Sequence, residues 1–501
     1  MARCIVAALA ALIGSSALPA GATAARNVKR ILHFSDVHLN ISSTFDDAES
    51  QAFPIRYGQD APLALLESAL TYAQSVLPNP DFVLYTGDHV AHGEFTDEYI
   101  ARAVEKNVRV IEKFFPPNNT EMMETTAIIG NADGNPDYHM EVTDPDREVN
   151  PSIKLISKVW DDSLSPSNFA ALNRRGYLRL PFDDKLVVLT LNTVPYSPSH
   201  VPNTSAMEDP FDQFAWLNAT LADLRAQAKY AFIAGHIAPF VDSYGGNPQW
   251  HVHYIEKYRD IVRHYSDVIK AQVFGHVHSI EFRIPVDTTG QSTEDELAAH
   301  SPVLVSGSIS PLFGNNPSFM VWDMDADTYE VLDYTVYGSN ISDSSEPLAW
   351  QPLFQASTAY GLDSLSSSAL QDLYTRMVQD PSLLEEYYWN MKAQSHRLPA
   401  CTTAECRAKI LCTMKWWTTK GEYLACVSSA SSIYTSTQRS TASQGNALSA
   451  GDVATTIGVT VVASAVVIAF IVFVVGWLQR SGVVKTQEAR RLEYEHAFPM
   501  L

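Results

Sequence analysis

Residues 31–38 read Ile-Leu-His-Phe-Ser-Asp-Val-His, an apolar strand-like run that ends in two side chains able to bind metal. Four further motifs follow along the chain, each after its own short apolar run. They are Gly87-Asp88, Gly130-Asn131, Gly235-His236 and Gly275-His276-Val277-His278. Carboxylate, amide and imidazole groups that meet at one edge of a sheet are suited to holding two divalent ions, which can attack a phosphate ester. The five motifs therefore predict a dinuclear metal site.

The spacing within these motifs brings their side chains together. In the D-x-H motif at residues 36–38 and the H-x-H motif at 276–278, the i, i+2 spacing places both side chains of a pair on one side of an extended segment. Glycine precedes Asp88, Asn131, His236 and the 276–278 motif. We expect each glycine to allow a tight turn from which the ligand projects beyond the end of its strand.

Apolar runs and helical patterns alternate between residues 25 and 345, which we take as the catalytic domain. The runs expected as buried strands lie at 31–35, 82–85, 127–129, 186–191, 230–234, 273–274 and 303–305. Residues 61–77 repeat leucine and alanine at helical spacing. This strand–helix–strand order predicts an α/β fold with helices on both faces of a sheet. Such sheets place their ligands at the carboxyl ends of the strands.

From residue 346 to 426 the pattern becomes helical, and we expect a small helical subdomain. An apolar stripe from Leu370 to Met377 follows a serine cap at 366–368. The end of this region holds four cysteines, Cys401, Cys406, Cys412 and Cys426. In a secreted chain they predict two disulfides, and three pairings are open. A zinc site is disfavoured because the paired C-x-x-C spacing is absent.

Both ends of the chain carry targeting patterns. Residues 1–24 have a short basic start, an apolar run and a small-residue cleavage site, as in a secretory signal peptide. Residues 453–478 are uncharged and long enough to cross a membrane as a helix, and basic residues follow in 479–501. A Ser/Thr-rich stalk is expected at 427–452. The patterns predict a single-pass type I membrane protein at the cell surface, lysosome or vacuole, with a luminal or extracellular catalytic domain. The basic tail disfavours the alternative, a cleaved lipid-anchor signal.

The glycosylation motifs agree with the secretory route, and the net charge limits the possible partners. The Asn-x-Ser/Thr candidates are Asn40, Asn118, Asn203, Asn218 and Asn340. A glycan on Asn40 would crowd His38. The formal net charge of -21 argues against nucleic-acid binding, which favours basic surfaces.

The motif order resembles the calcineurin-like metallophosphoesterase superfamily, whose members carry D-x-H, G-D, G-N-H-D/E, G-H and G-H-x-H blocks in this order. Within it, the chain is similar to the acid sphingomyelinase-like phosphodiesterases and the endopolyphosphatases, because His92 stands four residues after Asp88. Further matches lie at 212–217, 275–282, 316–319 and 360–362. Purple acid phosphatases have D-x-G and a tyrosine ligand, which this chain lacks. The resemblance covers about residues 30–426.

This resemblance implies a β-sandwich flanked by helices, with two metal positions. The implied ligands are Asp36, His38 and His278 for the first ion, Asn131, His236 and His276 for the second, and Asp88 as the bridge. Zinc is the expected metal, and a hydroxide shared by two divalent ions would attack phosphorus. The implied activity is hydrolysis of a phosphodiester or phosphoanhydride, such as a sphingomyelin-like lipid or a nucleotide. Endopolyphosphatase activity is the alternative.

The chain departs from the family pattern at Ala132, where members usually have the histidine that protonates the leaving group. Alanine can neither donate nor accept that proton. His92 is the best remaining candidate for this catalytic role, and His89 and His139 are weaker ones. Ala132 also motivates a second hypothesis, a surface binding protein that keeps the fold with impaired turnover. The complete set of seven ligands argues against that hypothesis.

Overall fold

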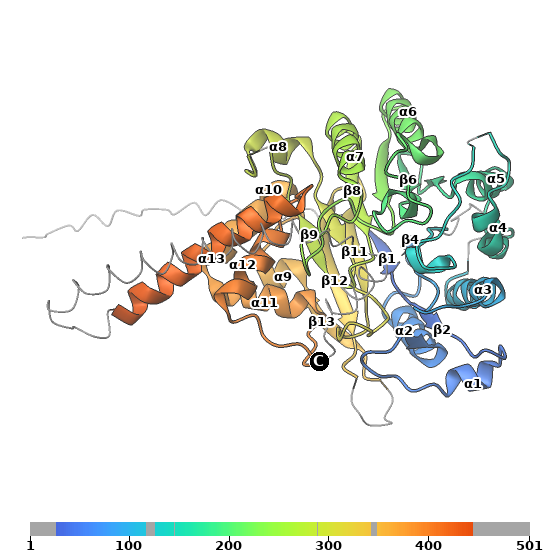
Figure 1. Ribbon diagram of the computed structural model, residues 1–501, viewed down its shortest axis with the longest axis horizontal. Helices are drawn as coiled ribbons and strands as arrows, with labels where there is room; N and C mark the ends of the chain where they lie inside the picture. The colour runs from blue at the N-terminus through green and yellow to red at the C-terminus, as the bar shows by residue number, and fades with distance from the viewer. Residues whose placement is uncertain (1–26, 117–125, 145, 288, 342–347, 444–501) are drawn as a thin grey trace, which may run out of the picture. The chain divides into compact units, whose positions relative to one another are not determined.

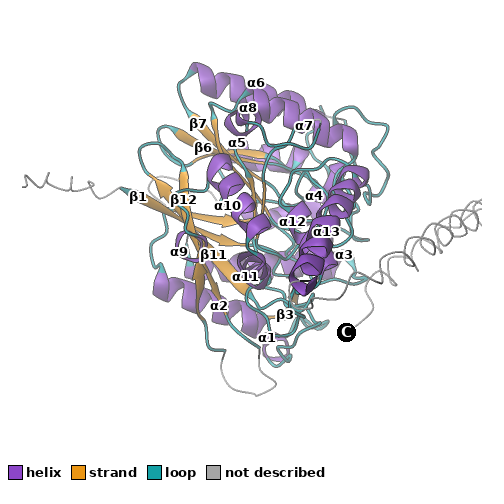
Figure 2. Ribbon diagram, turned by 90° about the vertical axis from the view of Figure 1, so that its left-hand side faces the viewer, coloured by secondary structure: helices purple, strands orange, loops and turns teal. Residues whose placement is uncertain are grey.

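The computed structural model describes residues 27–116, 126–144, 146–287, 289–341 and 348–443 (Figure 1). Two β-sheets lie at its centre, and helices surround them (Figures 1 and 2). The strand order is β13-β12-β11-β1-β4 in one sheet and β5-β6-β7-β8-β10-β9 in the other. A separate pair consists of β2 (Leu39–Asn40) and β3 (Ala61–Pro62).

The five-stranded sheet is built around β1 (Val28–Phe34). Its parallel neighbour is β4 (Phe82–Tyr85), and its antiparallel neighbour is β11 (Ser318–Asp325). The strands β12 (Val331–Gly338) and β13 (Gln351–Gln355) complete the sheet by antiparallel pairing. Because β1 and β4 run in the same direction, the residues that follow both strands meet at one edge.

The six-stranded sheet has a parallel centre and antiparallel edges. The parallel strands are β6 (Leu186–Thr190), β7 (Tyr230–Ala234), β8 (Ile269–Phe274) and β10 (Val303–Val305). The edges are β5 (Leu178–Pro181) and β9 (Glu281–Arg283). The carboxyl ends of β7 and β8 therefore also share one edge.

Thirteen α-helices are present among the described residues. Those before the six-stranded sheet are α1 (Asp47–Gln51), α2 (Leu63–Val76), α3 (Asp97–Phe114), α4 (Pro151–Ser157) and α5 (Pro166–Arg175). Those among its strands are α6 (Gln213–Ala226), α7 (Val252–His264) and α8 (Glu294–Ala299). The C-terminal ones are α9 (Ala356–Tyr360), α10 (Ser367–Gln379), α11 (Pro381–Met391), α12 (Ala404–Thr413) and α13 (Lys420–Ser443).

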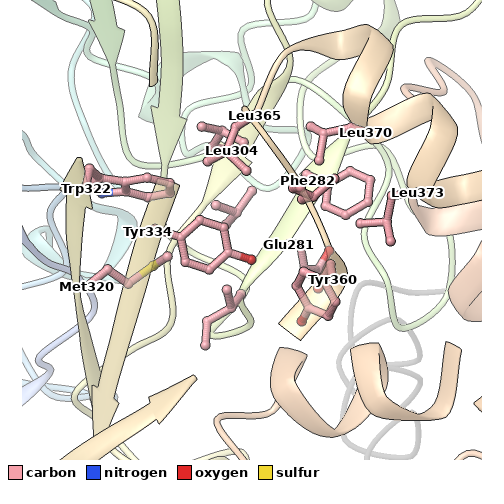
Figure 3. Close-up of a pocket in the computed structure, with 13 residues that line it drawn as sticks. Glu281, Phe282, Leu304, Met320, Trp322, Tyr334, Tyr360, Leu365, Leu370 and Leu373 are labelled. Carbon is pink, nitrogen blue, oxygen red and sulfur yellow. The ribbon is translucent and has the colours of Figure 1, made fainter. Parts of the chain in front are cut away.

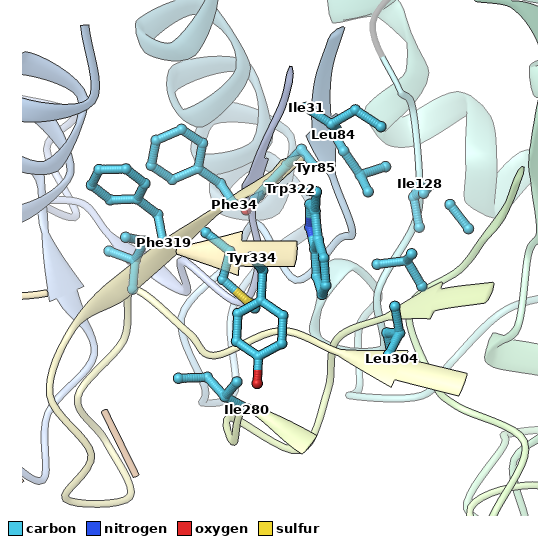
Figure 4. Close-up of a cluster of buried hydrophobic side chains, with 14 of the residues drawn as sticks. Ile31, Phe34, Leu84, Tyr85, Ile128, Ile280, Leu304, Phe319, Trp322 and Tyr334 are labelled. Carbon is cyan, nitrogen blue, oxygen red and sulfur yellow. The ribbon is translucent and has the colours of Figure 1, made fainter. Parts of the chain in front are cut away.

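Alternating side chains of the six-stranded sheet face two different cores. On β6, Val188 joins the main core, which also holds residues of the five-stranded sheet, so the two sheets pack against each other. Val187 and Leu189 join a second core, which α6 and α7 cover. Figure 4 shows part of the main core, which includes Phe34 of β1, Trp322 of β11 and Leu304 of β10.

The structure confirms the predicted strands except for residues 127–129. These residues are fully buried but form no strand. Beside β4, Thr126 pairs with Tyr85 through its side chain instead: the Tyr85 N–H donates to Thr126 Oγ1 at 2.8 Å, and that hydroxyl donates to the Tyr85 carbonyl at 3.1 Å. The hydroxyl thus occupies the backbone groups that a strand ladder would use.

The region predicted as a small helical subdomain, residues 346–426, is joined to the rest of the fold. It begins with β13, which extends the five-stranded sheet. Farther on, Ile284 donates its N–H to the Met414 carbonyl at 2.7 Å, and Trp416 donates to the Ile284 carbonyl at 2.8 Å. Trp416 is buried in the second core. The described residues up to Tyr434 accordingly belong to one compact unit.

Two disulfides are present, as predicted, and the structure selects one of the three pairings. The bonds are Cys401–Cys406 and Cys412–Cys426. The second bond ties α12 to α13. This pairing joins neighbours along the sequence and closes two short loops.

The first part of the predicted stalk is helical, because α13 runs to Ser443. No glycine or proline interrupts residues 427–443, and extending an existing helix costs less free energy than starting one. The predicted signal peptide 1–24, the rest of the stalk, the membrane span 453–478 and the tail 479–501 lie outside the described residues. Among the helices that the structure describes, none is both long and apolar enough to cross a membrane.

Breaking the buried ion pair on β9 should strongly destabilise the fold, although the pair adds little over two apolar side chains of similar size. Arg283 contacts Glu281 at 2.5 Å with both side chains at most 1% exposed, and its guanidinium lies 4.0 Å from the Phe240 ring. Glu281→Leu would leave the arginine charge unpaired, so we expect urea unfolding to show a loss of about 3–5 kcal/mol. The double variant E281L/R283M should recover most of that loss. An equal loss in both variants would contradict this account.

Candidate metal centre

Six of the seven predicted ligands follow a strand of one of the two sheets, and the seventh, Asn131, does not. Asp36 and His38 follow β1, Asp88 follows β4, His236 follows β7, His276 and His278 follow β8, and Asn131 starts a short 3-10 turn. The two sheets contribute almost equally to the set. The centre therefore forms only where the two sheets meet.

The first cluster consists of Asp36, His38 and His278, whose ligand atoms lie within 4.8 Å of one another. His278 Nε2 lies 3.1 Å from His38 Nε2 and 3.4 Å from Asp36 Oδ1. All three side chains are at most 1% exposed. Two buried imidazoles and a carboxylate that converge in this way are a donor set for a transition-metal ion.

The second cluster consists of Asp88, His236 and His276, and Asn131 joins it. His236 Nε2 lies 3.1 Å from Asp88 Oδ2 and 3.0 Å from Asn131 Oδ1. The same Asp88 Oδ2 lies 3.3 Å from His38 Nε2 of the first cluster. One carboxylate oxygen thus contacts both clusters, which is the position of a bridging ligand.

Backbone carbonyls determine which nitrogen of two histidines can bind metal. His38 Nδ1 lies 2.9 Å from the Val90 carbonyl, and His236 Nδ1 lies 2.9 Å from the Thr86 carbonyl. A carbonyl only accepts, so each Nδ1 carries the proton and donates. Each Nε2 faces the centre, where its lone pair could bind a metal, as in known metal sites.

His276 has the opposite arrangement, because its Nε2 lies 2.9 Å from Gln249 Oε1. Gln249 Nε2 donates to Asp242 Oδ2 at 3.2 Å and to the Asn247 carbonyl at 3.1 Å, which turns Oε1 toward the histidine. His276 therefore donates through Nε2 and offers Nδ1 to a metal. Sequence reasoning missed Gln249, which belongs to no motif.

The ligands hold an uncommon backbone conformation. Five of them have positive φ: Asp36 (49°), His38 (47°), Asp88 (57°), His276 (74°) and His278 (51°). This region is strained for residues other than glycine, and such strain gathers at functional sites. The surrounding fold must therefore hold these side chains in place at a cost in stability.

The glycines before the ligands serve mainly to let other groups approach. Only Gly87 has a left-handed φ, of +95°, so the expected tight turn holds there. A Cβ at Gly130 would lie 2.0 Å from Asp88 Oδ1, and one at Gly275 would lie 2.1 Å from Ser35 Oγ. At these two positions a side chain would displace a ligand or its neighbour.

The electrostatics of the centre suit two cations. Burial raises the pKa of Asp36 to about 7 and lowers that of His38 to about 4 and that of His276 to about 3. Burial also opposes a charge on His236, but the carboxylate of Asp88 raises its pKa to about 9. In the described part of the chain, only histidines form ion pairs with the two carboxylates. Two divalent ions would supply the missing positive charge, so the residues present fit the metals.

A family model described as calcineurin-like phosphoesterase matches residues 29–279. The chain belongs to this family. It is 27% identical over 338 residues to "Sphingomyelinase phosphodiesterase D" of Dictyostelium discoideum, covering 66% of this chain and 74% of that protein. It is 26% identical over 417 residues to "Acid sphingomyelinase-like phosphodiesterase 3b" of Mus musculus, covering 77% and 87%.

A third relative is "Cyclic GMP-AMP phosphodiesterase SMPDL3A" of Bos taurus, with 25% identity over 373 residues, 71% of this chain and 79% of that protein. Among solved structures, "Structure of PhoD" covers 66% of this chain and 70% of that chain at 10% identity and a TM-score of 0.43, too distant to support an argument. The relatives confirm the resemblance to the acid sphingomyelinase-like phosphodiesterases. This calcineurin-like phosphoesterase is a metal-dependent phosphoric ester hydrolase.

His92 lies beside the first cluster of the phosphoesterase, where its ring stacks on that of His38 with centroids 4.0 Å apart. Asp60 accepts from His92 Nδ1 at 3.1 Å and from its backbone N–H at 2.7 Å. Burial opposes the charged form, but the hydrogen bond to Asp60 raises the pKa of His92 to about 9. Sequence reasoning missed Asp60, because it lies in an irregular loop without a recognisable motif.

Ala132 contributes its backbone to the centre rather than its side chain. Its N–H donates to Asp88 Oδ1 at 2.9 Å, so the bridging carboxylate is held from the side away from the two histidines. The next residue, Asp133, accepts from the N–H groups of Gly130 at 2.8 Å and His89 at 2.7 Å. These contacts fix the loop, and none of them requires a particular side chain at position 132.

The weaker proton-donor candidates have other surroundings. The ring of His89 is buried against Tyr85 and Trp160, with centroids 4.5 and 5.6 Å away, and burial lowers its pKa. His139 forms a backbone bridge with Val201. His92 is thus the candidate whose ring contacts a metal ligand.

The predicted glycosylation sites differ in accessibility. Asn203, Asn218 and Asn340 are exposed. Asn40 is half-buried, and its Oδ1 accepts from the Tyr99 hydroxyl at 3.2 Å. Asn118 lies outside the described residues.

A groove of about 480 Å³ opens beside His92. Its apolar lining includes Phe53, Phe95 and Leu312, and Asp60 lies in its wall. A second cavity, between the sheets and α10, has a volume of only about 10 Å³ and a mostly apolar lining (Figure 3). That volume is close to the minimum for one water molecule, so the second cavity is a packing gap.

Gly130→Ala should empty the metal centre. Its Cβ would lie 2.0 Å from Asp88 Oδ1 and 2.3 Å from the backbone N of Asp88, so the side chain and loop of Asp88 would have to move. We expect the purified variant to lose both ions when metal content is measured by mass spectrometry. Gly421→Ala is the control, because the nearest atom there is 3.9 Å away. A G130A protein with full metal content would refute the bridging role of Asp88.

Proposed function

We propose that this protein hydrolyses a phosphodiester or phosphoanhydride at a dinuclear zinc centre, on the luminal or extracellular side of a membrane. The observation that carries the proposal is the position of Asp88 Oδ2, 3.3 Å from His38 Nε2 and 3.1 Å from His236 Nε2. When bound, the two ions would supply Lewis acidity and a water nucleophile at neutral pH.

The proposed proton donor to the leaving group is His92. Its Nδ1 is held by Asp60, so Nε2 remains to carry the proton that is transferred. The stack on His38 places this ring against the first cluster. Because Ala132 supplies no second imidazole, protonation of the leaving group depends on His92 alone.

The groove beside His92 supports a leaving group with an apolar body. Its apolar side chains include Phe53, Phe95 and Leu312, and its polar ones are Asn40, Gln59, Asp60 and His92. The relatives are named for sphingomyelin and cyclic GMP–AMP, so lipids and nucleotides are the two substrate classes to compare. No lysine or arginine lines the groove within the described residues, which disfavours the alternative of a polyphosphate chain. The other alternative, a binding protein with impaired turnover, is motivated by Ala132.

Purified protein loaded with zinc should hydrolyse bis-(p-nitrophenyl) phosphate from mildly acidic to neutral pH. Asp88→Asn should lower turnover by more than about a hundredfold, because the shared ligand loses its charge. Absence of zinc-dependent turnover in the wild type would favour the binding-protein hypothesis. Sphingomyelin, ATP, CDP-choline and polyphosphate, assayed on the same sample, would identify the substrate class.

His92→Ala should affect substrates according to their leaving groups. With an alkyl phosphodiester, turnover should fall about 10²–10⁴-fold, because the departing alkoxide needs a proton. With a p-nitrophenyl ester the loss should be much smaller, since that anion leaves without protonation. His264→Ala, at an exposed position of α7, is the matched control. Equal losses on both substrates would rule out a proton-donor role.

A further inference from the structure

Five buried side chains form a hydrogen-bonded chain that ends on a metal ligand. Trp322 Nε1 lies 3.1 Å from His33 Nδ1, and His33 Nε2 lies 2.9 Å from Thr86 Oγ1. Thr86 Oγ1 lies 2.6 Å from Ser35 Oγ, which contacts Asp36 Oδ2. Trp322 is 3% exposed and the other four are fully buried, so bulk water does not compete for these bonds.

The tryptophan end of the chain determines the direction of the bonds in it. An indole N–H can only donate, and a neutral imidazole that accepts through one nitrogen carries its proton on the other. His33 must therefore accept from Trp322 through Nδ1, and its proton lies on Nε2. From there the His33 Nε2–H donates to Thr86, Thr86 donates to Ser35, and Ser35 donates to Asp36. Burial lowers the pKa of His33 to about 3, so its ring is neutral, as this pattern requires.

This chain holds one oxygen of Asp36 and leaves the other for a metal. Oδ2 accepts from Ser35, whereas Oδ1 lies 3.4 Å from His278 Nε2 and 3.9 Å from His38 Nε2. The backbone N–H of His276 lies within 3.1 Å of both oxygens and does not distinguish them. The donor from Ser35 is therefore what assigns Oδ1 to the first ion.

Gly275 keeps the space for the chain open. A Cβ there would lie 2.1 Å from Ser35 Oγ, 2.7 Å from Asp36 Oδ2 and 3.1 Å from Thr86 Oγ1. Its φ is not in the left-handed region, so packing around these three groups is what requires glycine at this position.

We propose that Trp322, His33 and Thr86 are positioning residues that orient Asp36 for the first metal ion. Trp322 lies on β11 in the main core (Figure 4). It contacts His33 of β1, although the two residues are 289 positions apart in the sequence. The inference rests on the metal binding in the proposed function, but on neither hydrolysis nor a particular substrate.

A pair of substitutions at Thr86 separates the hydroxyl from the shape of the side chain. Thr86→Val keeps the shape and breaks the chain, so zinc titration of the metal-free protein should show the first ion binding about 10–100-fold more weakly. The second ion should bind as in the wild type, because His236 uses only the backbone carbonyl of Thr86. Thr86→Ser keeps the hydroxyl and should bind both ions normally. Wild-type affinity for both ions in T86V would overturn the proposal.

The histidine tautomer supplies a readout without metal or substrate. In protein with ¹⁵N-labelled histidine, NMR should show His33, assigned from the His33→Gln variant, protonated on Nε2 in the wild type. Trp322→Phe should release this preference. Tyr334→Phe is the control, because Tyr334 packs against Trp322 with ring centroids 5.2 Å apart but is no member of the chain.

The outcomes separate this inference from the proposed function. Wild-type His33 protonated on Nδ1 would overturn the chain whatever the enzyme hydrolyses. If T86V binds the first ion more weakly and the wild type cleaves no phosphodiester, the hydrogen-bonded chain is supported and only the proposed hydrolysis is refuted. A protein that binds no zinc would overturn both.

Discussion

The site depends on one contact more than on any other, the position of Asp88 Oδ2 between His38 and His236. Asp88 and His38 follow adjacent parallel strands, and the His38 N–H donates to the Asp88 carbonyl at 3.0 Å. His236 follows a strand of the other sheet. The bridging geometry therefore requires both the pairing of β1 with β4 and the packing of one sheet on the other. A change that disturbed either the strand pairing or the sheet packing would separate the two clusters.

Holding these ligands opposes folding in two ways. Five of the ligands have strained backbones at positive φ, and the two carboxylates lie buried near each other among imidazoles. Burial and the charge of Asp88 both raise the pKa of Asp36. Metal binding offsets this cost in folding free energy, since the deprotonated ligands then pair with a cation. The Asp133 carboxylate restrains the loop by accepting from two backbone N–H groups, and the glycines at 130 and 275 leave room for the side chains of Asp88 and Ser35.

Six of the seven predicted ligands follow a strand and reach the common edge through local spacing, so the sequence could place them together. The seventh, Asn131, follows a buried segment that forms no strand. The sequence could not reveal Asp60, Gln249 or Trp322, which act on these ligands from other parts of the chain. Such partners depend on which loops pack together, and a short sequence motif carries no information about that packing.

The same limit explains why the tertiary contacts of the C-terminal region were not predicted. Its helical periodicity was visible, but the pairing of β13 with β12 and the burial of Trp416 depend on the assembled sheets.

Ala132 and the complete ligand set are compatible because they concern different chemistry. Position 132 acts on the metal centre only through its N–H to Asp88 Oδ1, which every residue except proline supplies. Loss of an imidazole there leaves the bridging carboxylate in place. The loss removes a proton donor, which slows the reaction only for leaving groups that cannot depart as anions. In the proposed reaction, Ala132 therefore limits which leaving groups can depart. The departure of a leaving group that needs a proton then depends on His92, which Asp60 holds in place.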